Sequence, residues 1–107
     1  MGSEQFVVFV TAPKGELAAQ IAHALVGEKL AACVNILPSV RSIYTWDDAV
    51  QDDEEQLLII KTTAERYPAL EARVRALHSY EVAEIIALPI VRGSADYLSW
   101  LTAGCRP

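Results

Sequence analysis

The sequence predicts an α+β protein: a ferredoxin-like βαββαβ sandwich with an extended β-hairpin and a short C-terminal helix. The chain has 107 residues, which is the length of one domain. Segments rich in β-branched and aromatic residues alternate with segments of helical apolar spacing, in the order of that fold. Right-handed crossovers would place both helices on one face of a four-stranded sheet. We expect a single domain over 1–107, with flexible ends at 1–4 and 103–107.

The first strand and helix are clearly marked. Residues 6–10 form a continuous run of apolar β-branched and aromatic side chains, typical of a strand that is buried on both faces and therefore central. Leu17, Ile21 and Leu25 recur at helical spacing, which predicts a helix that ends near Gly27.

A long hairpin follows. Three strand segments are expected in it: 30–37, 40–46 and 54–61. Pro38–Ser39 breaks the first two apart, and 46–49 has the composition of a turn. Alternation in the second segment places Tyr44 and Trp46 on one face.

The second half of the chain is predicted to contain a helix, an edge strand and a final helix. Thr62 and Glu65 fit a capping box, but Pro68 favours a regular helix that begins near position 68 and stops around His78. Residues 85–88 predict a strand at a sheet edge, because Pro89 cannot donate to a ladder. Ser94 is the expected cap of a final helix, and we expect Cys105 to be an exposed thiol beyond it.

The predicted sheet would leave one face without helices. Apolar residues make up 52% of the chain, so Leu, Ile, Val, Tyr and Trp on that face would form a larger apolar patch than monomers usually expose. The long hairpin also leaves free strand edges. A closed cyclic oligomer would cover both, and we therefore expect self-association.

Composition excludes several functions. The net charge of −5 disfavours binding to a phosphate backbone, so we expect no nucleic acid partner. No apolar stretch approaches the ~18 residues of a membrane span, so we expect no membrane partner. No signal peptide is visible and two cysteines are too few for a disulfide framework, which together predict a cytoplasmic protein with reduced thiols.

Five ordered motifs resemble those of the divalent-cation tolerance proteins of the CutA type: KLAACVN at 29–35, SIYTW at 42–46, IIKT at 59–62, LHSYEVAEI at 77–85 and DYLSWL at 96–101. The resemblance implies a ferredoxin-like homotrimer, a cytoplasmic bacterial setting, and a link to copper and other divalent metals. The chain departs from the family pattern at Ser79 and Ala83, where proline is usual.

Three residues are the expected metal ligands. Cys33 offers a thiolate that suits Cu(I) or Zn(II), although a free cysteine in a strand also packs as a small apolar group. His78 offers a neutral imidazole, although a cation at a helix C-terminus also has a purely stabilising role. Glu84 would assist with its carboxylate. We expect no required cofactor, with Cu(II) or another divalent cation as the bound ion. A closed site needs four ligands, so it would draw on more than one subunit or be weak and superficial.

Three further residues are expected to line clefts between subunits: Lys61, Tyr80 and Trp46. They support an alternative function, a PII-like trimeric signalling module that binds a small anion or metabolite there. We expect no enzymatic activity, because no catalytic motif is present and a strand-buried Cys33 lacks the accessible, electropositive setting of a nucleophile.

Overall fold

The structure, a computed structural model, describes residues 4–107. Its elements are β1 (Gln5–Pro13), α1 (Leu17–Gly27), β2 (Cys33–Trp46), β3 (Ala49–Thr63), α2 (Tyr67–Leu77), β4 (Ile85–Pro89) and α3 (Ala95–Gly104). This order confirms the predicted α+β sandwich with its long hairpin and C-terminal helix. The expected flexible N-terminal segment lies, except for Glu4, outside the described residues.

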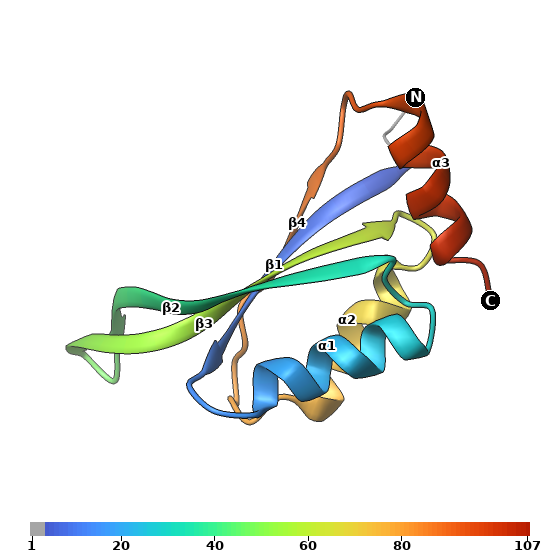
Figure 1. The fold of residues 1–107 in the computed structure, drawn as a ribbon. Coiled ribbons are helices and arrows are strands. Elements are labelled where there is room, and N and C mark those ends of the chain that lie inside the picture. The colour runs from blue at the N-terminus through green and yellow to red at the C-terminus, as the bar shows by residue number, and fades with distance from the viewer. Residues whose placement is uncertain (1–3) are drawn as a thin grey trace.

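The sheet has the strand order β2-β3-β1-β4, and every neighbouring pair is antiparallel. β1 is central, as predicted, and β4 with its terminal Pro89 lies at an edge. Figure 1 shows α1 and α2 on one side of the sheet, with the β2–β3 hairpin extending well beyond the other strands. The expectation that β1 is buried on both faces is wrong, because Val7 and Phe9 on the side away from the helices remain partly exposed.

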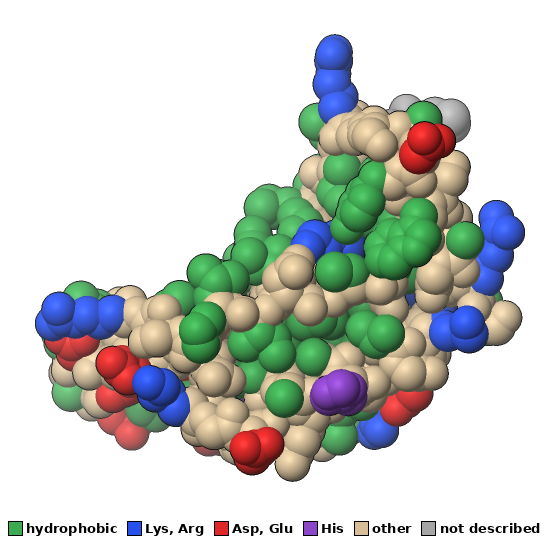
Figure 2. All heavy atoms as spheres, viewed as in Figure 1, with side chains coloured by type: hydrophobic (Ala, Val, Ile, Leu, Met, Phe, Trp, Pro, Cys, Tyr) green, Lys and Arg blue, Asp and Glu red, His purple; other side chains and the backbone are tan. Residues whose placement is uncertain are grey.

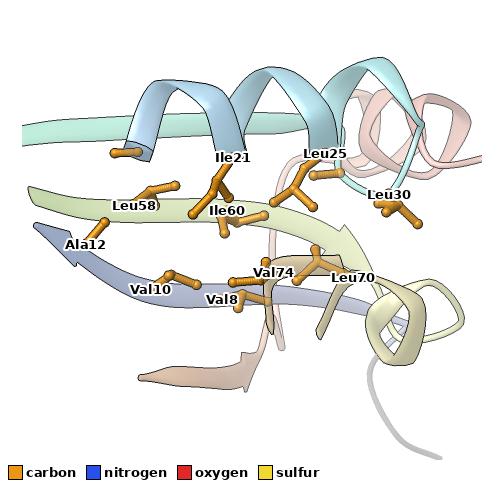
Figure 3. Packing of buried hydrophobic residues seen from close by; sticks show 12 residues of the cluster. Val8, Val10, Ala12, Ile21, Leu25, Leu30, Leu58, Ile60, Leu70 and Val74 are labelled. Atoms are coloured by element: carbon orange, nitrogen blue, oxygen red, sulfur yellow. The ribbon is translucent and has the colours of Figure 1, made fainter. Parts of the chain in front are cut away.

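Buried apolar side chains fill the space between the two helices and the sheet (Figure 3). Alternate residues of β1 and β3 point toward the helices, as the two-residue repeat of a strand requires. The main members of this core are Val8, Val10, Ile21, Leu25, Leu58, Ile60, Leu70 and Val74. Burial of each large aliphatic side chain contributes roughly 1.5–3 kcal/mol.

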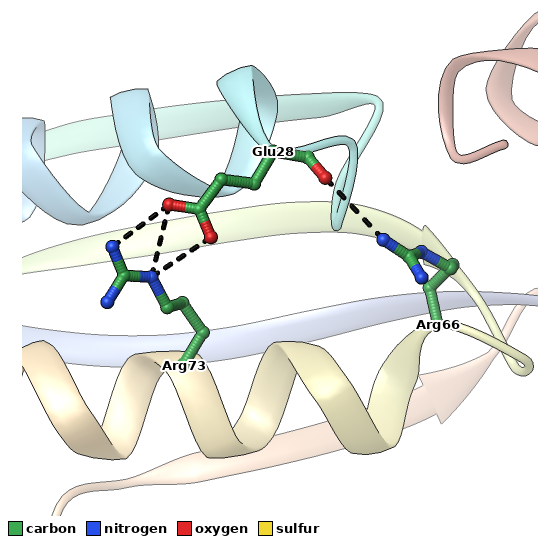
Figure 4. Close-up of polar contacts among 3 residues, drawn as sticks. All are labelled: Glu28, Arg66 and Arg73. Atoms are coloured by element: carbon green, nitrogen blue, oxygen red, sulfur yellow. Dashed lines mark hydrogen bonds and ion pairs between the residues drawn. The ribbon is translucent and has the colours of Figure 1, made fainter. Parts of the chain in front are cut away.

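Two arginines of the second helical segment bind the end of α1 (Figure 4). Arg73 donates to both carboxylate oxygens of Glu28, at 3.0 Å from Nε and 2.9 Å from Nη2. Arg66 donates to the main-chain carbonyl of Glu28, the residue that follows α1, at 3.5 Å and to that of Lys29 at 3.2 Å. No helical amide follows to bind the carbonyls at this end of α1, so Arg66 supplies the missing donors. These contacts hold the end of α1 beside α2.

β2 is one continuous strand, which corrects the predicted break at Pro38–Ser39. Leu37 lies opposite Leu57 and Val40 lies opposite Glu55, so β2 advances three residues where β3 advances two. The extra residue is a β-bulge, where a proline without an N–H group is tolerated.

The bulge decides which side chains share a face. Cys33 and Asn35 precede the bulge and point away from the helices, and Tyr44 and Trp46 after it do the same. The first pair has odd residue numbers and the second pair has even ones, which strict alternation would place on opposite faces. Without the extra residue, the two aromatic side chains would lie on the helix side. The bulge therefore keeps Tyr44 and Trp46 on the same face as Cys33.

The environments of Thr62 and Cys105 differ from the sequence prediction. Thr62 does not cap a helix, because its hydroxyl is buried and donates to the Leu30 carbonyl at 2.6 Å. Cys105 is not exposed, since only 2% of its surface is accessible, and α3 includes part of the expected flexible end at 103–107. Ser94 does cap α3, by accepting from the Tyr97 amide at 3.1 Å.

The sheet face away from α1 and α2, called here the open face, carries large exposed apolar side chains. Leu88 of β4 is 50% exposed and Trp100 of α3 is 53% exposed. Figure 2 shows hydrophobic side chains gathered in a band from the hairpin to the α3 end.

None of the helices within 4–107 has the length and apolar character to span a bilayer.

The hairpin turn offers a test of backbone strain. Asp47 and Asp48 have φ values of 51° and 59°, and Trp46 pairs with Ala49, which is a two-residue turn of type I′. Replacement Asp48→Gly relieves the left-handed conformation and is expected to raise the free energy of unfolding by about 0.5 kcal/mol. Urea denaturation at fixed protein concentration measures this change. Asp48→Ala is the matched control and should destabilise the protein, because alanine resists positive φ.

Candidate functional site

Of the six residues singled out in the sequence, five lie in two separate groups on the open-face side of the molecule, and His78 adjoins the second group through the Tyr80 amide. One group surrounds Cys33 and Lys61, near the end of the sheet that α3 covers. The other surrounds Tyr80 and Trp46, along the hairpin arm, and includes Glu84. The two groups have different chemistry and are described in turn.

Cys33 and Lys61 face each other across β2 and β3. Both contact the side-chain oxygen of Asn35: the Cys33 thiol donates to Oδ1 at 3.8 Å, and Lys61 Nζ donates to the same atom. Cys33 is partly exposed, so its sulfur is not enclosed in the core. Burial raises the pKa of Tyr97 in α3, and the neighbouring Cys33 adds to that increase.

His78 lies between β1 and the segment that leads to β4. Its Nε2 is 2.7 Å from the Thr11 carbonyl, and its Nδ1 accepts from the Tyr80 amide at 3.1 Å. A carbonyl accepts and an amide donates, so these contacts fit the neutral tautomer with the proton on Nε2. Both ring nitrogens therefore bind the main chain. In this geometry His78 fixes the start of the 79–84 segment and has no free nitrogen for a metal ion.

The fold keeps Cys33 apart from His78. Cys33 lies opposite Lys61, whereas the carbonyl that binds His78 belongs to Thr11, opposite Leu57. Four residues of β3 separate these positions, which is about 13 Å along a strand. Within residues 4–107, no three side chains of His, Cys, Asp or Glu come together in a way that could hold a metal ion.

At the base of the hairpin, two tyrosines each bind a carboxylate. Tyr80 donates to Glu55 Oε2 at 2.7 Å, and Tyr44 donates to Asp53 Oδ2 at 2.7 Å. Glu55 is 5% exposed, the most enclosed charged residue of the described chain. Burial, followed by the Glu55 contact, raises the pKa of Tyr80 strongly, and the bond to Asp53 raises the pKa of Tyr44.

Tyr44, Glu55 and Tyr80 line a groove of about 430 Å³ between the hairpin arm and the 79–84 segment. Trp46 and Tyr44 form one wall, and Tyr80 and Val82 form the other. Glu55, which is largely buried, and Glu84 contribute two carboxylates to the lining. The groove is therefore aromatic and acidic, with no lysine or arginine among its lining residues.

Sequence reasoning identified Trp46, Tyr80 and Glu84 but missed Glu55 and Asn35. Glu55 stands in a run of acidic residues that is typical of a solvent-exposed strand. Its burial follows from its position opposite the bulge, which only the strand register reveals. Asn35 follows Cys33 by two residues and therefore shares its face, so strand alternation could have indicated it.

A family model and several known proteins match this chain over most of its length. The model of the family described as CutA1 divalent ion tolerance protein matches residues 6–104. A divalent-cation tolerance protein CutA from Thermus thermophilus is 55% identical over 95 residues, covering 89% of this chain and 92% of that protein. The chloroplastic protein CutA of Arabidopsis thaliana is 50% identical over 94% of this chain, which spans only 55% of that relative.

The solved structures agree with the fold. The Thermus thermophilus divalent cation tolerance protein superposes with a TM-score of 0.91 at 52% identity, covering 94% of this chain and 97% of that one. The predicted family and fold are thereby confirmed. The predicted cytoplasmic location stays a prediction, because one of these relatives is described as chloroplastic.

The tyrosine contacts predict how stability depends on pH. The pKa values of Tyr44, Tyr67, Tyr80 and Tyr97 are all raised above the ordinary value of about 10. Above that pH the folded protein holds protons that the unfolded chain has lost, so the free energy of unfolding must fall as pH rises. Tyr80→Phe should flatten this fall most, since the pKa of Tyr80 is raised furthest.

Urea denaturation between about pH 9 and about pH 11.5 measures this slope, with tyrosinate absorbance as the direct readout of ionisation. Tyr67→Phe is the control, because its partner Glu71 lies on the same helix and away from the groove. An equal change of slope in both variants would contradict the assignment to the Tyr80–Glu55 pair.

Proposed function

The chain belongs to the CutA1 divalent ion tolerance family, and from this we propose that it binds divalent cations, copper(II) first among them, as a homotrimer that contributes to metal tolerance. It would act as a binding protein and not as an enzyme. The observation that carries the proposal is the placement of a partly exposed thiol, Cys33, on an open apolar sheet face.

The open face supports self-association. Its exposed side chains include Leu37, Ile86, Leu88 and Trp100, each at least 38% accessible in the single chain. A contiguous apolar surface of this kind is costly in water, and a closed ring of copies would cover it on every subunit. β2 also presents an unpaired edge along its length, which further chains could protect.

Metal binding would then involve more than one subunit. Within residues 4–107 a single chain assembles no metal cluster, so Cys33 needs donors from a neighbouring copy. The Asn35 side-chain oxygen beside it could bind the ion only after release of its hydrogen bond from Lys61. We keep Glu84 as a carboxylate helper, whereas His78 would have to release the Thr11 carbonyl or the Tyr80 amide before it could bind a metal ion.

The PII-like alternative, with a small anion in clefts near Lys61 and Tyr80, has less support. Lys61 is directed to Asn35, and Tyr80 lines a groove whose charged residues are acidic. An anion would be repelled there. A small anion that stabilises the assembled protein while metal ions have no effect would nevertheless favour this alternative over metal binding.

Titration calorimetry with copper(II), after removal of reductant from the reduced protein, tests the metal site. Cys33→Ser is expected to weaken binding at least about tenfold, since a hydroxyl is a much poorer ligand for copper than a thiolate. Cys105→Ser is the matched control and should leave the affinity unchanged, because that thiol is buried against Thr62.

Two further measurements complete this test. His78→Ala should weaken binding less than Cys33→Ser does, because both ring nitrogens already bind the main chain. Light scattering on the wild-type protein should give the mass of three chains. Unchanged copper affinity in Cys33→Ser would end the assignment of the thiol, and a stable single chain at micromolar dilution would end the shared site.

A further inference from the structure

The ion pairs within residues 4–107 all lie away from the open face. Four pairs of side chains form them: Lys14–Glu54, Arg41–Asp52, Arg73–Glu28 and Arg75–Glu71. The last two belong to the helix layer, and the first two use side chains of the hairpin arm that strand alternation directs to the helix side. The charges of the open face are therefore left without ion pairs in a single chain.

Lys61 is the cation of the open face. It lies opposite Cys33 of β2 and Val7 of β1, and it is already partly buried in the single chain. Its Nζ donates to the side-chain oxygen of Asn35, which carries no charge. Copies that cover the open face would remove water from this ammonium group. A cation that is enclosed in this way is costly unless a carboxylate joins it.

The opposite imbalance occurs in the groove beside the 79–84 segment. Two carboxylates line this groove, those of Glu55 and Glu84, and no lysine or arginine does. Glu55 already accepts from Tyr80 and is only 5% exposed. Glu84 pairs with no cation of residues 4–107. It is therefore the carboxylate that is available to a cation from outside the chain.

The strand register keeps the two charges of one chain apart. Lys61 lies opposite Val7, and Val7 lies opposite Leu88 on its other side. Glu84 comes just before β4, four residues from Leu88, which is about 13 Å along a strand. β1 also separates β3 from β4 across the sheet. A second copy can bring the two charges together, because the cation and the carboxylate occupy different positions on the same side of the molecule.

We propose that Glu84 of one copy forms an ion pair with Lys61 of a neighbouring copy, beside the Cys33 thiol. The inference rests on the self-association in the proposed function and not on metal binding. A contact between two different places on one surface joins copies head to tail, and it closes into a ring when the rotation returns to the first copy. Each subunit then gives one carboxylate and receives one, so both imbalances are removed.

The pair would complete the surroundings of the thiol. Cys33 lies opposite Lys61, so a carboxylate that reaches Lys61 also comes close to the sulfur. Cys33 and Glu84, which the sequence predicts as ligands of one ion, are separated within a chain and would meet only between copies. The neighbouring copy thus contributes a residue that the site lacks in a single chain.

A charge exchange tests the proposal on the intact assembly. The measurement is the rate at which subunits exchange between unlabelled and ¹⁵N-labelled protein, followed by native mass spectrometry at low salt. Lys61→Glu and Glu84→Lys each place like charges together and are expected to speed exchange at least about tenfold. The variant that carries both substitutions restores the opposite charges and should exchange within about threefold of the wild-type rate.

Matched controls change the same charges elsewhere. Lys29→Glu, beyond the end of α1, should alter exchange less than about twofold. Glu81→Lys lies in the same segment as Glu84 but outside the lining of the groove, and Lys61→Glu should not rescue it. Lys61→Met and Glu84→Gln test the pair without charge reversal, in case a reversed charge prevents folding. Their combined effect on exchange should not exceed that of the larger single effect by more than about twofold.

Three results separate the possible failures. Effects that multiply in both combined variants would exclude a contact between the two side chains. Unchanged exchange in Glu84→Gln, together with slower exchange in inorganic phosphate only where Lys61 is retained, would mean that a bound anion neutralises the lysine. A wild-type protein with the mass of a single chain would end the proposed self-association and this pair with it, whereas an assembled protein without coupling would end the pair alone.

Discussion

The open face of the sheet is the constraint on which the rest of the structure depends. Two helices suffice to cover one side of four strands, and the core that they form is mainly apolar. The strands are apolar on their other side as well, where Phe9, Ile86 and Leu88 remain accessible. Stability gained by burial is therefore incomplete in one chain, and functional side chains such as Cys33 lie on a surface that favours contact with other molecules.

The β-bulge extends this face into the hairpin arm. By inserting one residue at Pro38–Ser39, it directs Tyr44 and Trp46 to the side that also carries Cys33. The 79–84 segment, fixed by His78 to the β1 main chain, then brings Tyr80 against Glu55. A local irregularity of the backbone and a neutral histidine thus build a groove from strands and a loop that are distant in sequence.

The fold was predictable from the sequence because each element carries its own local signal: alternation in the strands, helical spacing in α1 and α2, and the Ser94 cap. The errors arose where tertiary contacts outweigh local preference. Thr62 has the sequence context of a cap, but its hydroxyl is buried in the core and donates to the Leu30 carbonyl. Cys105 was expected to be exposed because tails fray, yet it packs beside Thr62. The geometry of His78 and Glu55 depends on register and on the course of a loop, which residue types do not encode.

The concentration of charge on the hairpin has a kinetic consequence. Six of the 14 acidic residues lie between positions 47 and 55, and Asp52 and Glu54 alone among them form ion pairs in the described residues. They lie at one extremity of a molecule that measures 44 Å along its longest axis. The resulting electric field reaches about 10 Å into solution at 0.1 M salt. Diffusing cations of any kind are drawn first to this extremity, so the arm would speed their encounter with the protein even where the final contacts lie elsewhere.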